Sequence, residues 1–462
     1  MNMEQINGIL NTINGLVWGP PLLMLLMGTG IWLTIRLGLL QLVKLPTALK
    51  LIFFARNKGK GDIDSFTALC TALAATVGTG NIVGVATAVK AGGPGALFWM
   101  WVAAFFGMAT KYAEGVLAVK YRTTDENGNA AGGPMYYIEK GLGPKYRPLA
   151  IMFALFGVMT ASLSNGTFTQ VNAISSIINV ATGIPPVMVV CVVTVLVTVV
   201  TLGGLQSIAR VSDKVVPFMA VLYFGATISV LYAYADQIPA AISLVINSAF
   251  TTTAAQGGFL GASIMVAMRS GVARGIYSNE AGLGSAPIVA AAAKTKWPAE
   301  QGLVSMTGTF IDTIIICTMT GLTLIVSGVW CGDFNGAALT EAAFATVYPE
   351  YAKYTLAIGL SLFAFTTIIG WNYYGERCLV YLCGVKVIKP YRYIYITLIA
   401  LSAFLKLETI WIIADIVNGL MAFPNLIALL CLSGVIVAET KAYFNHTSKV
   451  NDRLESIKGS SK

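Results

Sequence analysis

The sequence predicts an all-α membrane protein with 11 transmembrane helices, in which one N-terminal helix precedes two five-helix inverted repeats with broken first helices. Three observations support this prediction. Of the 462 residues, 56% are hydrophobic and only 11% are charged, whereas a soluble chain carries roughly a quarter charged residues. Eleven apolar runs are long enough to cross a membrane. Two of these runs contain polar, glycine-rich interruptions.

The eleven spans follow from the length of the apolar runs, because a helix needs about 20 mostly apolar residues to cross the hydrocarbon core. They are predicted at 17–37, 65–90, 94–120, 148–179, 186–204, 214–235, 258–293, 301–330, 353–376, 391–405 and 408–438. The stretch 238–255 is punctuated by Thr and Asn. We therefore expect it to form an interfacial helix rather than a span.

Lysine and arginine residues gather in every second predicted loop and in the C-terminal tail. Because such residues concentrate on the cytoplasmic side, we predict an outside N-terminus and a cytoplasmic C-terminus. Only Lys90, Lys353 and Lys406 then fall outside. This topology explains the net charge of +9 without a nucleic-acid partner. The polar start of the chain has no signal-peptide pattern, and the short tails suit a multi-pass protein of a prokaryotic plasma membrane.

The sequence contains few of the features expected of an enzyme or of a channel. The seven cysteines are scattered without metal-ligand spacing, and His446 is the only histidine. Histidine-based zinc or triad chemistry is therefore not expected, and we do not predict an enzyme. A channel would need a continuous polar pathway or filter, and the sequence has no repeated filter motif or acidic ring.

The two interruptions lie at 74–84 and 275–285, in the second and seventh predicted spans. Gly78-Thr79-Gly80-Asn81 in the first matches Gly282-Leu283-Gly284-Ser285 in the second. Because the two spans are separated by an odd number of crossings, the units that they begin must run with opposite topology. The chain is thus predicted to be one domain over 1–462, with an accessory span at 17–37, repeats at 65–235 and 258–438, and a cytoplasmic tail at 439–462. Paired interruptions of this kind point to the binding site of a secondary transporter.

A break of this kind has a direct physical use. Glycine permits backbone angles that end a helix, and the freed N–H and C=O groups must then line a cavity or be buried in protein. Freed N–H groups suit a carboxylate, and freed carbonyl groups suit a cation. The alternative is close helix packing, since Gly80 and Gly84 also form a small-xxx-small motif.

Four segments resemble the alanine or glycine:cation symporter family: Gly78–Asn81, Gly92–Trp101, Gly132–Tyr137 and Ser278–Gly282. The resemblance covers nearly the whole chain, and the tryptophan-rich second segment is its most specific part. It implies sodium-driven uptake of small neutral amino acids, alanine or glycine. It also implies the five-plus-five, leucine-transporter-like fold of the amino acid-polyamine-cation superfamily, which agrees with the repeat inferred above.

The resemblance further implies a site for each transported species. The substrate carboxylate would bind the backbone of the first break at Gly78, Thr79 and Gly80, with Asn81 beside them. The second break would contribute Tyr277, Ser278 and Asn279. Sodium, as the co-transported ion, would be held by the carbonyl groups of Ala74, Val77 and Phe363 and by the hydroxyl groups of Thr366 and Thr367. The alternative for the two threonines is a hydrogen bond to a carbonyl group one turn earlier.

Other polar residues lie within predicted spans. The Gln170 amide could bind both the amine and the carboxylate of a substrate, or it could join two helices. For the nearby Asn165 and Asn172 we predict neither of these two roles. Trp371 could cap the substrate methyl group and limit side-chain size, or it could be a packed or interfacial aromatic residue.

Charged residues within the spans are functional candidates. Lys111 and Glu114 are three residues apart on one helix face, so we expect an internal ion pair. Glu280 and Arg274 lie near the second break, where a structural pair and a functional role are both open. Arg269 has no obvious partner in the sequence.

The predicted mechanism is alternating access, with sodium ordering the first break so that it receives the amino acid. Each ligand then favours binding of the other, and this coupling is reciprocal. The second candidate is a proton-coupled carrier of the same fold, with Glu280 as the proton acceptor. The partners expected are a small amino acid, sodium and the lipid bilayer.

Overall fold

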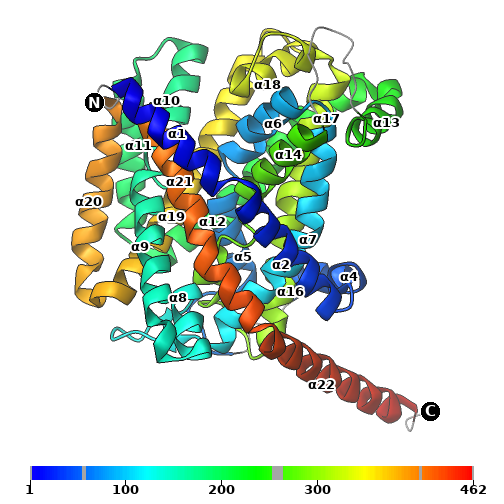
Figure 1. The fold of residues 1–462 in the computed structure, drawn as a ribbon, viewed down its shortest axis with the longest axis vertical. Helices are drawn as coiled ribbons and strands as arrows, with labels where there is room; N and C mark the ends of the chain where they lie inside the picture. The colour runs from blue at the N-terminus through cyan, green and yellow to red at the C-terminus, as the bar shows by residue number, and fades with distance from the viewer. Residues whose placement is uncertain (1–2, 55–58, 252–263, 405–407, 460–462) are drawn as a thin grey trace.

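The computed structural model describes residues 3–54, 59–251, 264–404 and 408–459. Helices form an elongated bundle, and the only β-structure among these residues is a short hairpin, β1 (Thr123–Thr124) paired with β2 (Ala130–Ala131), and two isolated bridges. The N-terminus lies at one end of the bundle and the C-terminal helix projects from the other (Figure 1). We call these the α18 end and the hairpin end. Lys406 and parts of the predicted segments 238–255 and 258–293 lie outside the described residues.

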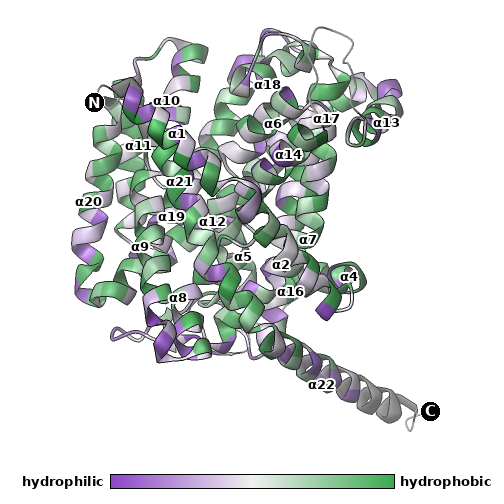
Figure 2. Cartoon of the chain, viewed as in Figure 1, coloured by the Kyte–Doolittle hydropathy of each residue, from purple (hydrophilic) through white to green (hydrophobic). Residues whose placement is uncertain are grey.

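Seven helical stretches in the described part are long and apolar enough to cross a membrane, and one bent pair of helices raises the number to eight. The seven are Gln5–Arg36, Gly95–Lys120, Pro144–Thr182, Gly204–Ala233, Pro298–Val326, Ala352–Cys383 and Ile412–Cys431. Hydrophilic residues gather mainly at the two ends of the bundle, with hydrophobic residues along the helices between them (Figure 2). The structure therefore supports a multi-pass membrane protein, while the number eleven stays a prediction.

The N-terminal half of the bundle contains the first break. Its helices are α1 (Met3–Val17), α2 (Pro20–Arg36), α3 (Leu40–Val43), α4 (Leu45–Phe54), α5 (Ser65–Thr76), the π-helix η1 (Gly80–Gly84), α6 (Val85–Gly92), α7 (Gly95–Lys120), α8 (Pro134–Tyr137), the π-helix η2 (Ile138–Leu142), the 3-10 helix η3 (Pro144–Tyr146), α9 (Arg147–Leu163), α10 (Phe168–Thr182), α11 (Pro186–Thr201), α12 (Gly204–Ala233), the 3-10 helix η4 (Ala235–Gln237) and α13 (Ile238–Ser248). Segment 1–11, expected to be a polar start, is mostly helical from Met3 onward. The predicted span 148–179 is two helices, because the chain turns at 164–167.

The C-terminal half contains the second break. Its helices are α14 (Ile264–Asn279), α15 (Ala286–Ala290), α16 (Pro298–Thr309), the π-helix η5 (Phe310–Cys317), α17 (Thr318–Val326), the 3-10 helix η6 (Val329–Cys331), α18 (Gly336–Ala345), α19 (Ala352–Cys383), the 3-10 helix η7 (Val385–Val387), α20 (Ile388–Leu401), the 3-10 helix η8 (Ser402–Phe404), α21 (Glu408–Cys431) and α22 (Ser433–Gly459). The sequence analysis did not predict α18. It also ended the last span at 438, whereas the helix α22 continues well beyond that point.

Local sequence explains both breaks. The Asp64 carboxylate caps α5 by accepting the Thr67 N–H at 2.8 Å, as N-terminal caps do. The helix ends at Val77, which is extended with ψ 94°, and α5 meets the next helical segment at 55°. In the second break Glu280, Gly282 and Gly284 have φ values of 56°, 89° and 84°. This left-handed region favours glycine, so the two glycines let the chain leave the helix there.

Candidate functional site

The two breaks touch each other in the middle of the bundle. A Cβ atom on Gly80 would lie 3.1 Å from the Ser278 Cα and 3.5 Å from the Tyr277 Cδ1. A side chain at this position would be crowded against the second break, and the absence of a Cβ atom in glycine relieves this close approach of the two backbones. The paired interruptions in the sequence therefore meet, as predicted.

The first break leaves two of its N–H groups available. The Gly78 N–H donates to the Asn81 Oδ1 at 2.9 Å. The N–H groups of Thr79 and Gly80 take part in none of the backbone hydrogen bonds that the described chain forms outside its helices. Thr79 also lines a cavity of about 340 Å³, together with Asn172 and Glu341. The first break thus reaches this cavity through Thr79.

The second break, by contrast, is closed by bonds within the protein. The Ala281 N–H donates to the Asn279 Oδ1 at 2.9 Å, and the N–H groups of Gly282 and Gly284 each donate to the Glu114 Oε1 at 3.2 Å. The N–H groups of Ala281, Gly282 and Gly284 are thus taken up by side chains of the protein, whereas those of Thr79 and Gly80 are not, although the two breaks share a sequence pattern.

Asp312 lies against both breaks, and the sequence analysis missed it. Its carboxylate is fully buried. It accepts hydrogen bonds from the Asn81 amide at 2.7 Å and from the Ser278 hydroxyl at 2.9 Å. The residue belongs to the π-helix η5, and π-helical turns are frequent at functional sites. A signal was present, because Asp312 is the only acidic residue in the predicted span 301–330 and such residues are functional candidates.

Gln170 reaches the first break from α10. Its Nε2 donates to the Thr79 hydroxyl at 3.3 Å, and its Oε1 is buried without a partner in the described chain. A buried amide oxygen without a donor is costly. Gln170 therefore presents an acceptor that a substrate amine would satisfy.

Tyr277 lies beside a second cavity, of about 550 Å³, at the α18 end. Its hydroxyl donates to the Asn165 Oδ1 at 2.9 Å. Asp415, Arg269 and Arg274 also line this cavity. Arg274 stacks over the Tyr277 ring at 5.6 Å, so the guanidinium group has an aromatic neighbour.

Of the threonine pair of α19, Thr367 faces the first break, whereas Thr366 lies against α12. A Cβ atom on Gly78 would lie 2.6 Å from the Thr367 Oγ1, so this hydroxyl faces the break. The Thr366 Oγ1 lies 3.6 Å from the Met219 sulfur on α12. Both hydroxyls donate to the Phe363 carbonyl oxygen, at 3.0 and 2.9 Å. The hydrogen bonds to an earlier turn, which we considered as the alternative, are therefore present.

The Trp371 side chain bonds to Glu280, which is a residue of the second break. The Trp371 Nε1 donates to the Glu280 Oε1 at 3.2 Å, and the Ser285 hydroxyl donates to the other carboxylate oxygen. Trp371 is almost fully buried and packs edge-on against Tyr374, with ring centroids 5.4 Å apart. Its indole nitrogen thus anchors a carboxylate rather than facing an interface.

Comparison with known proteins identifies the family. A model of the sodium:alanine symporter family matches residues 3–456. The chain belongs to the sodium:alanine symporter family. It is 57% identical to an uncharacterized transporter of Haemophilus influenzae over 98% of this chain and all of the relative. It is 50% identical to the sodium/alanine symporter AgcS of Methanococcus maripaludis, over 94% of this chain and 96% of the relative.

A solved structure is similar to this family member in fold. The structure of MhsT in complex with L-phenylalanine aligns with a TM-score of 0.51 and 12% identity, over 82% of this chain and 99% of that chain. At this identity the likeness concerns the fold alone, and it agrees with the leucine-transporter-like fold that the sequence predicted. Members of the sodium:alanine symporter family are secondary transporters, so the prediction that the protein is not an enzyme is confirmed.

One predicted contact of this symporter family member is wrong. Lys111 and Glu114 do not pair: the ion pairs found within 4.0 Å among the described residues do not join them. Glu114 bonds instead to the second break and to the Asn425 amide at 2.7 Å. Lys111 is buried and lines a small cavity beside Thr76 and Asn279. Glu114 thus bonds to residues that are distant in the sequence instead of pairing with Lys111, one turn away on the same helix.

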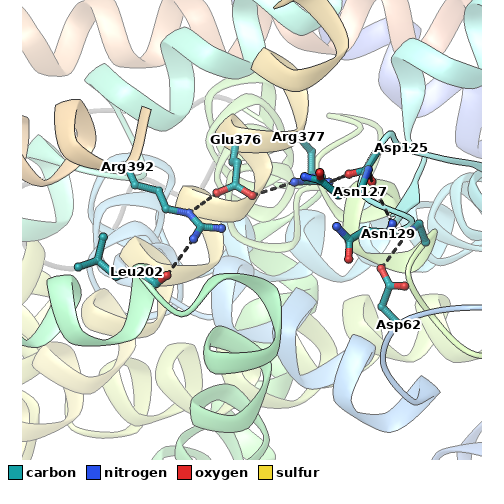
Figure 3. A network of polar contacts seen from close by, with 9 residues as sticks. Asp62, Asp125, Asn127, Asn129, Leu202, Glu376, Arg377 and Arg392 are labelled. Atoms are coloured by element: carbon teal, nitrogen blue, oxygen red, sulfur yellow. Dashed lines mark hydrogen bonds and ion pairs between the residues drawn. The ribbon is translucent and has the colours of Figure 1, made fainter. Parts of the chain in front are cut away.

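A polar network joins several elements at the hairpin end of this symporter family member (Figure 3) and borders a cavity of about 340 Å³. The Arg377 guanidinium donates to Asp125 and to Glu376, each at 2.9 Å. Arg392 of α20 donates to the other Glu376 oxygen at 2.6 Å. The network continues to Asp62, which accepts the Ala130 N–H at 2.9 Å. It thus joins the hairpin to α19, α20 and the segment before α5.

Proposed function

We propose that the protein couples the uptake of a small neutral amino acid, alanine and/or glycine, to the movement of sodium down its gradient. The observation that carries this proposal is the pair of N–H groups at Thr79 and Gly80, which have no partner outside the described helices, in a break where Gly78 lies against the Thr367 hydroxyl. Membership of the sodium:alanine symporter family supports it, as does the name of the Methanococcus relative.

The substrate site would lie where the two breaks meet. The carboxylate of the amino acid would receive the N–H groups of Thr79 and Gly80, and its amine would donate to the unpartnered Gln170 Oε1. Asn81, Tyr277, Ser278, Asn279 and Trp371 would complete the walls, with Trp371 limiting side-chain size. Uptake by reconstituted vesicles in the presence of competing small amino acids tests this. Competition that weakens steadily as the side chain grows supports the site, and indifference to side-chain size contradicts it.

The sodium site would join the end of α5 to α19. The carbonyl groups of Ala74, Val77 and Phe363 and the hydroxyl groups of Thr366 and Thr367 supply five oxygen ligands, and a hard cation prefers oxygen ligands. The Thr367 position beside Gly78 supports this assignment. Sodium binding would compete with the two hydroxyl bonds to Phe363. Replacing sodium by another monovalent cation should therefore abolish uptake driven by its gradient.

A proton-coupled carrier is the second candidate, and Asp312 gives it a specific basis. This buried carboxylate bonds to both breaks, whereas Glu280, the acceptor expected earlier, is held by Trp371 and Ser285. Uptake that follows an imposed pH gradient and ignores sodium would select this candidate.

Alternating access would move the two ends of the bundle in turn. The cavities at Thr79 and Tyr277 lie toward the α18 end and each touches a break. Cavities of about 340 and 420 Å³ at the hairpin end are lined by the Arg377 network or by Asp62 and its neighbours, and neither touches a break. With an outside N-terminus and a cytoplasmic C-terminus, this arrangement corresponds to an outward-facing state. The inverted repeats at 65–235 and 258–438, with the accessory span at 17–37, would supply the moving parts.

A further inference from the structure

Glu114 of α7 occupies the second break in the way that a ligand carboxylate would. Its Oε1 accepts three hydrogen bonds, from the N–H groups of Gly282 and Gly284 at 3.2 Å each and from the Asn425 Nδ2 at 2.7 Å. The side chain is 1% exposed. Three N–H donors thus converge on one buried oxygen atom, and a buried donor that loses its acceptor is costly, so this side chain holds the break.

The geometry of the break is suited to an anion. Gly282 and Gly284 both have positive φ, at 89° and 84°, and their N–H groups converge on one oxygen atom. The Leu283 N–H between them donates to the Glu280 carbonyl oxygen at 3.2 Å instead, and backbone N–H groups that converge in this way form anion-binding concavities. In the first break, Gly80 corresponds to Gly284 and its N–H forms none of the backbone hydrogen bonds found outside the described helices, whereas Gly78 corresponds to Gly282 and donates to the Asn81 Oδ1. The protein thus supplies its own carboxylate to Gly282 and Gly284, and these two N–H groups are not left for a substrate carboxylate.

The same carboxylate ties several helices together. Asn425 of α21 bonds to Glu114 and also to the Gly282 carbonyl oxygen at 2.9 Å. The Tyr137 hydroxyl of α8 donates to the Asn425 Oδ1. A substituent Cβ on Gly284 would lie 3.0 Å from the Asn425 Cγ, so the fit is tight. The second break, α7, α8 and α21 thereby share one polar junction.

We propose that Glu114 is a positioning residue for transport, whose carboxylate takes the place of a ligand in the second break and makes that break move together with α7 and α21. The inference rests on the proposed function in so far as uptake is the readout. A purely structural packing role predicts that any side chain of similar size suffices. A ligand-like role predicts that an added carboxylate can replace the missing one.

The uptake test compares Glu114→Gln and Glu114→Ala with the unchanged protein in vesicles. Glu114→Gln keeps the shape but replaces one carboxylate oxygen by an NH2 group, which cannot accept the three hydrogen bonds. The maximal uptake rate should therefore fall roughly tenfold or more, while the KM for alanine changes little because the first break is intact. Glu114→Ala should lose uptake, and millimolar formate should restore part of it. Gluconate, a carboxylate too large for the space, should not. Glu350→Ala, at an exposed site, is the control and should behave as the unchanged protein.

A second measurement does not depend on the substrate. Hydrogen–deuterium exchange of the amides at 281–284 should accelerate roughly tenfold or more in Glu114→Ala, and formate should slow it again. If the unchanged protein takes up no alanine, the proposed function fails and the exchange result still decides the role of Glu114. Normal uptake by Glu114→Gln, or exchange that neither the substitution nor formate alters, would overturn the inference.

Discussion

The Asn81 amide donates to the Asp312 carboxylate at 2.7 Å, although 231 residues separate them in the chain. Asn81 also holds the first break, because its Oδ1 accepts the Gly78 N–H. The other Asp312 oxygen accepts from Ser278 in the second break. One buried carboxylate therefore bonds to both breaks, and any change in its charge acts on both at once.

Replacing Asp312 by asparagine should lower sodium-driven alanine uptake at least about tenfold. Hydrogen bonds to charged groups contribute roughly 1.5–3 kcal/mol, and asparagine places an NH2 group where Asn81 or Ser278 now donates. Initial rates in proteoliposomes measure the effect. Asp333→Asn, at an exposed position, is the matched control, and equal rates for the two variants would remove Asp312 from the site.

Removing both hydroxyl groups of the α19 threonine pair should abolish sodium-dependent uptake. Thr366→Ala together with Thr367→Ala takes away two of the five proposed oxygen ligands. Thr367→Ser should keep much of the activity, because it retains the hydroxyl that faces Gly78. The sodium concentration that gives half-maximal uptake is the measurement.

A matched control separates this effect from the loss of a helix hydrogen bond. Thr397 of α20 is exposed and donates to the Tyr393 carbonyl oxygen at 2.9 Å, in the same pattern as Thr367. Thr397→Ala should leave the sodium dependence unchanged. Full activity of the double variant at α19 would refute the sodium site.

Gly80→Ala should reduce uptake roughly tenfold, whereas Gly84→Ala should be tolerated. The added Cβ at Gly80 would lie 3.1 Å from the Ser278 Cα, but at Gly84 it would meet nothing within 4 Å. Crowding of this kind typically costs about 1–3 kcal/mol. Uptake rates normalised to the amount of folded protein measure the difference. A similar loss in both variants would favour the small-xxx-small packing interpretation instead.

The sequence allowed the two breaks to be predicted because glycine clusters are visible locally. It did not allow the partners of Glu114 and Asp312 to be predicted. Lys111 was the only oppositely charged residue at helical spacing from Glu114, yet the actual partner Gly282 lies 168 residues away. Asp312 lies in an apolar run with no neighbouring pattern, and its partners come from two other segments. The division of 148–179 into two helices was also missed, because its turn at Ser164, Asn165 and Gly166 looked like polar residues within a helix.

Arg377→Ala should destabilise the protein and favour opening of the hairpin end. Arg377 and its acceptors Asp125 and Glu376 are at most 6% exposed, and removing one partner of a buried ion pair costs about 3–5 kcal/mol. The melting temperature in detergent should fall. Arg377→Ala combined with Asp125→Ala should recover part of the loss, since no unpaired carboxylate then remains at that position. Equal melting temperatures for all three proteins would show that the network is dispensable.

Two native cysteines at opposite ends of the bundle test the predicted topology. Cys331 lies in η6 toward the α18 end, and Cys383 ends α19 toward the hairpin end; both are exposed. With the N-terminus outside, a membrane-impermeant maleimide should label Cys331 in intact cells and should reach Cys383 only after permeabilisation. Variants that each retain one of the two cysteines, with serine at the other and at the exposed Cys191 and Cys431, assign the label to one position. Labelling of Cys383 but not Cys331 in intact cells would reverse the orientation, and would then place the Arg377 network outside.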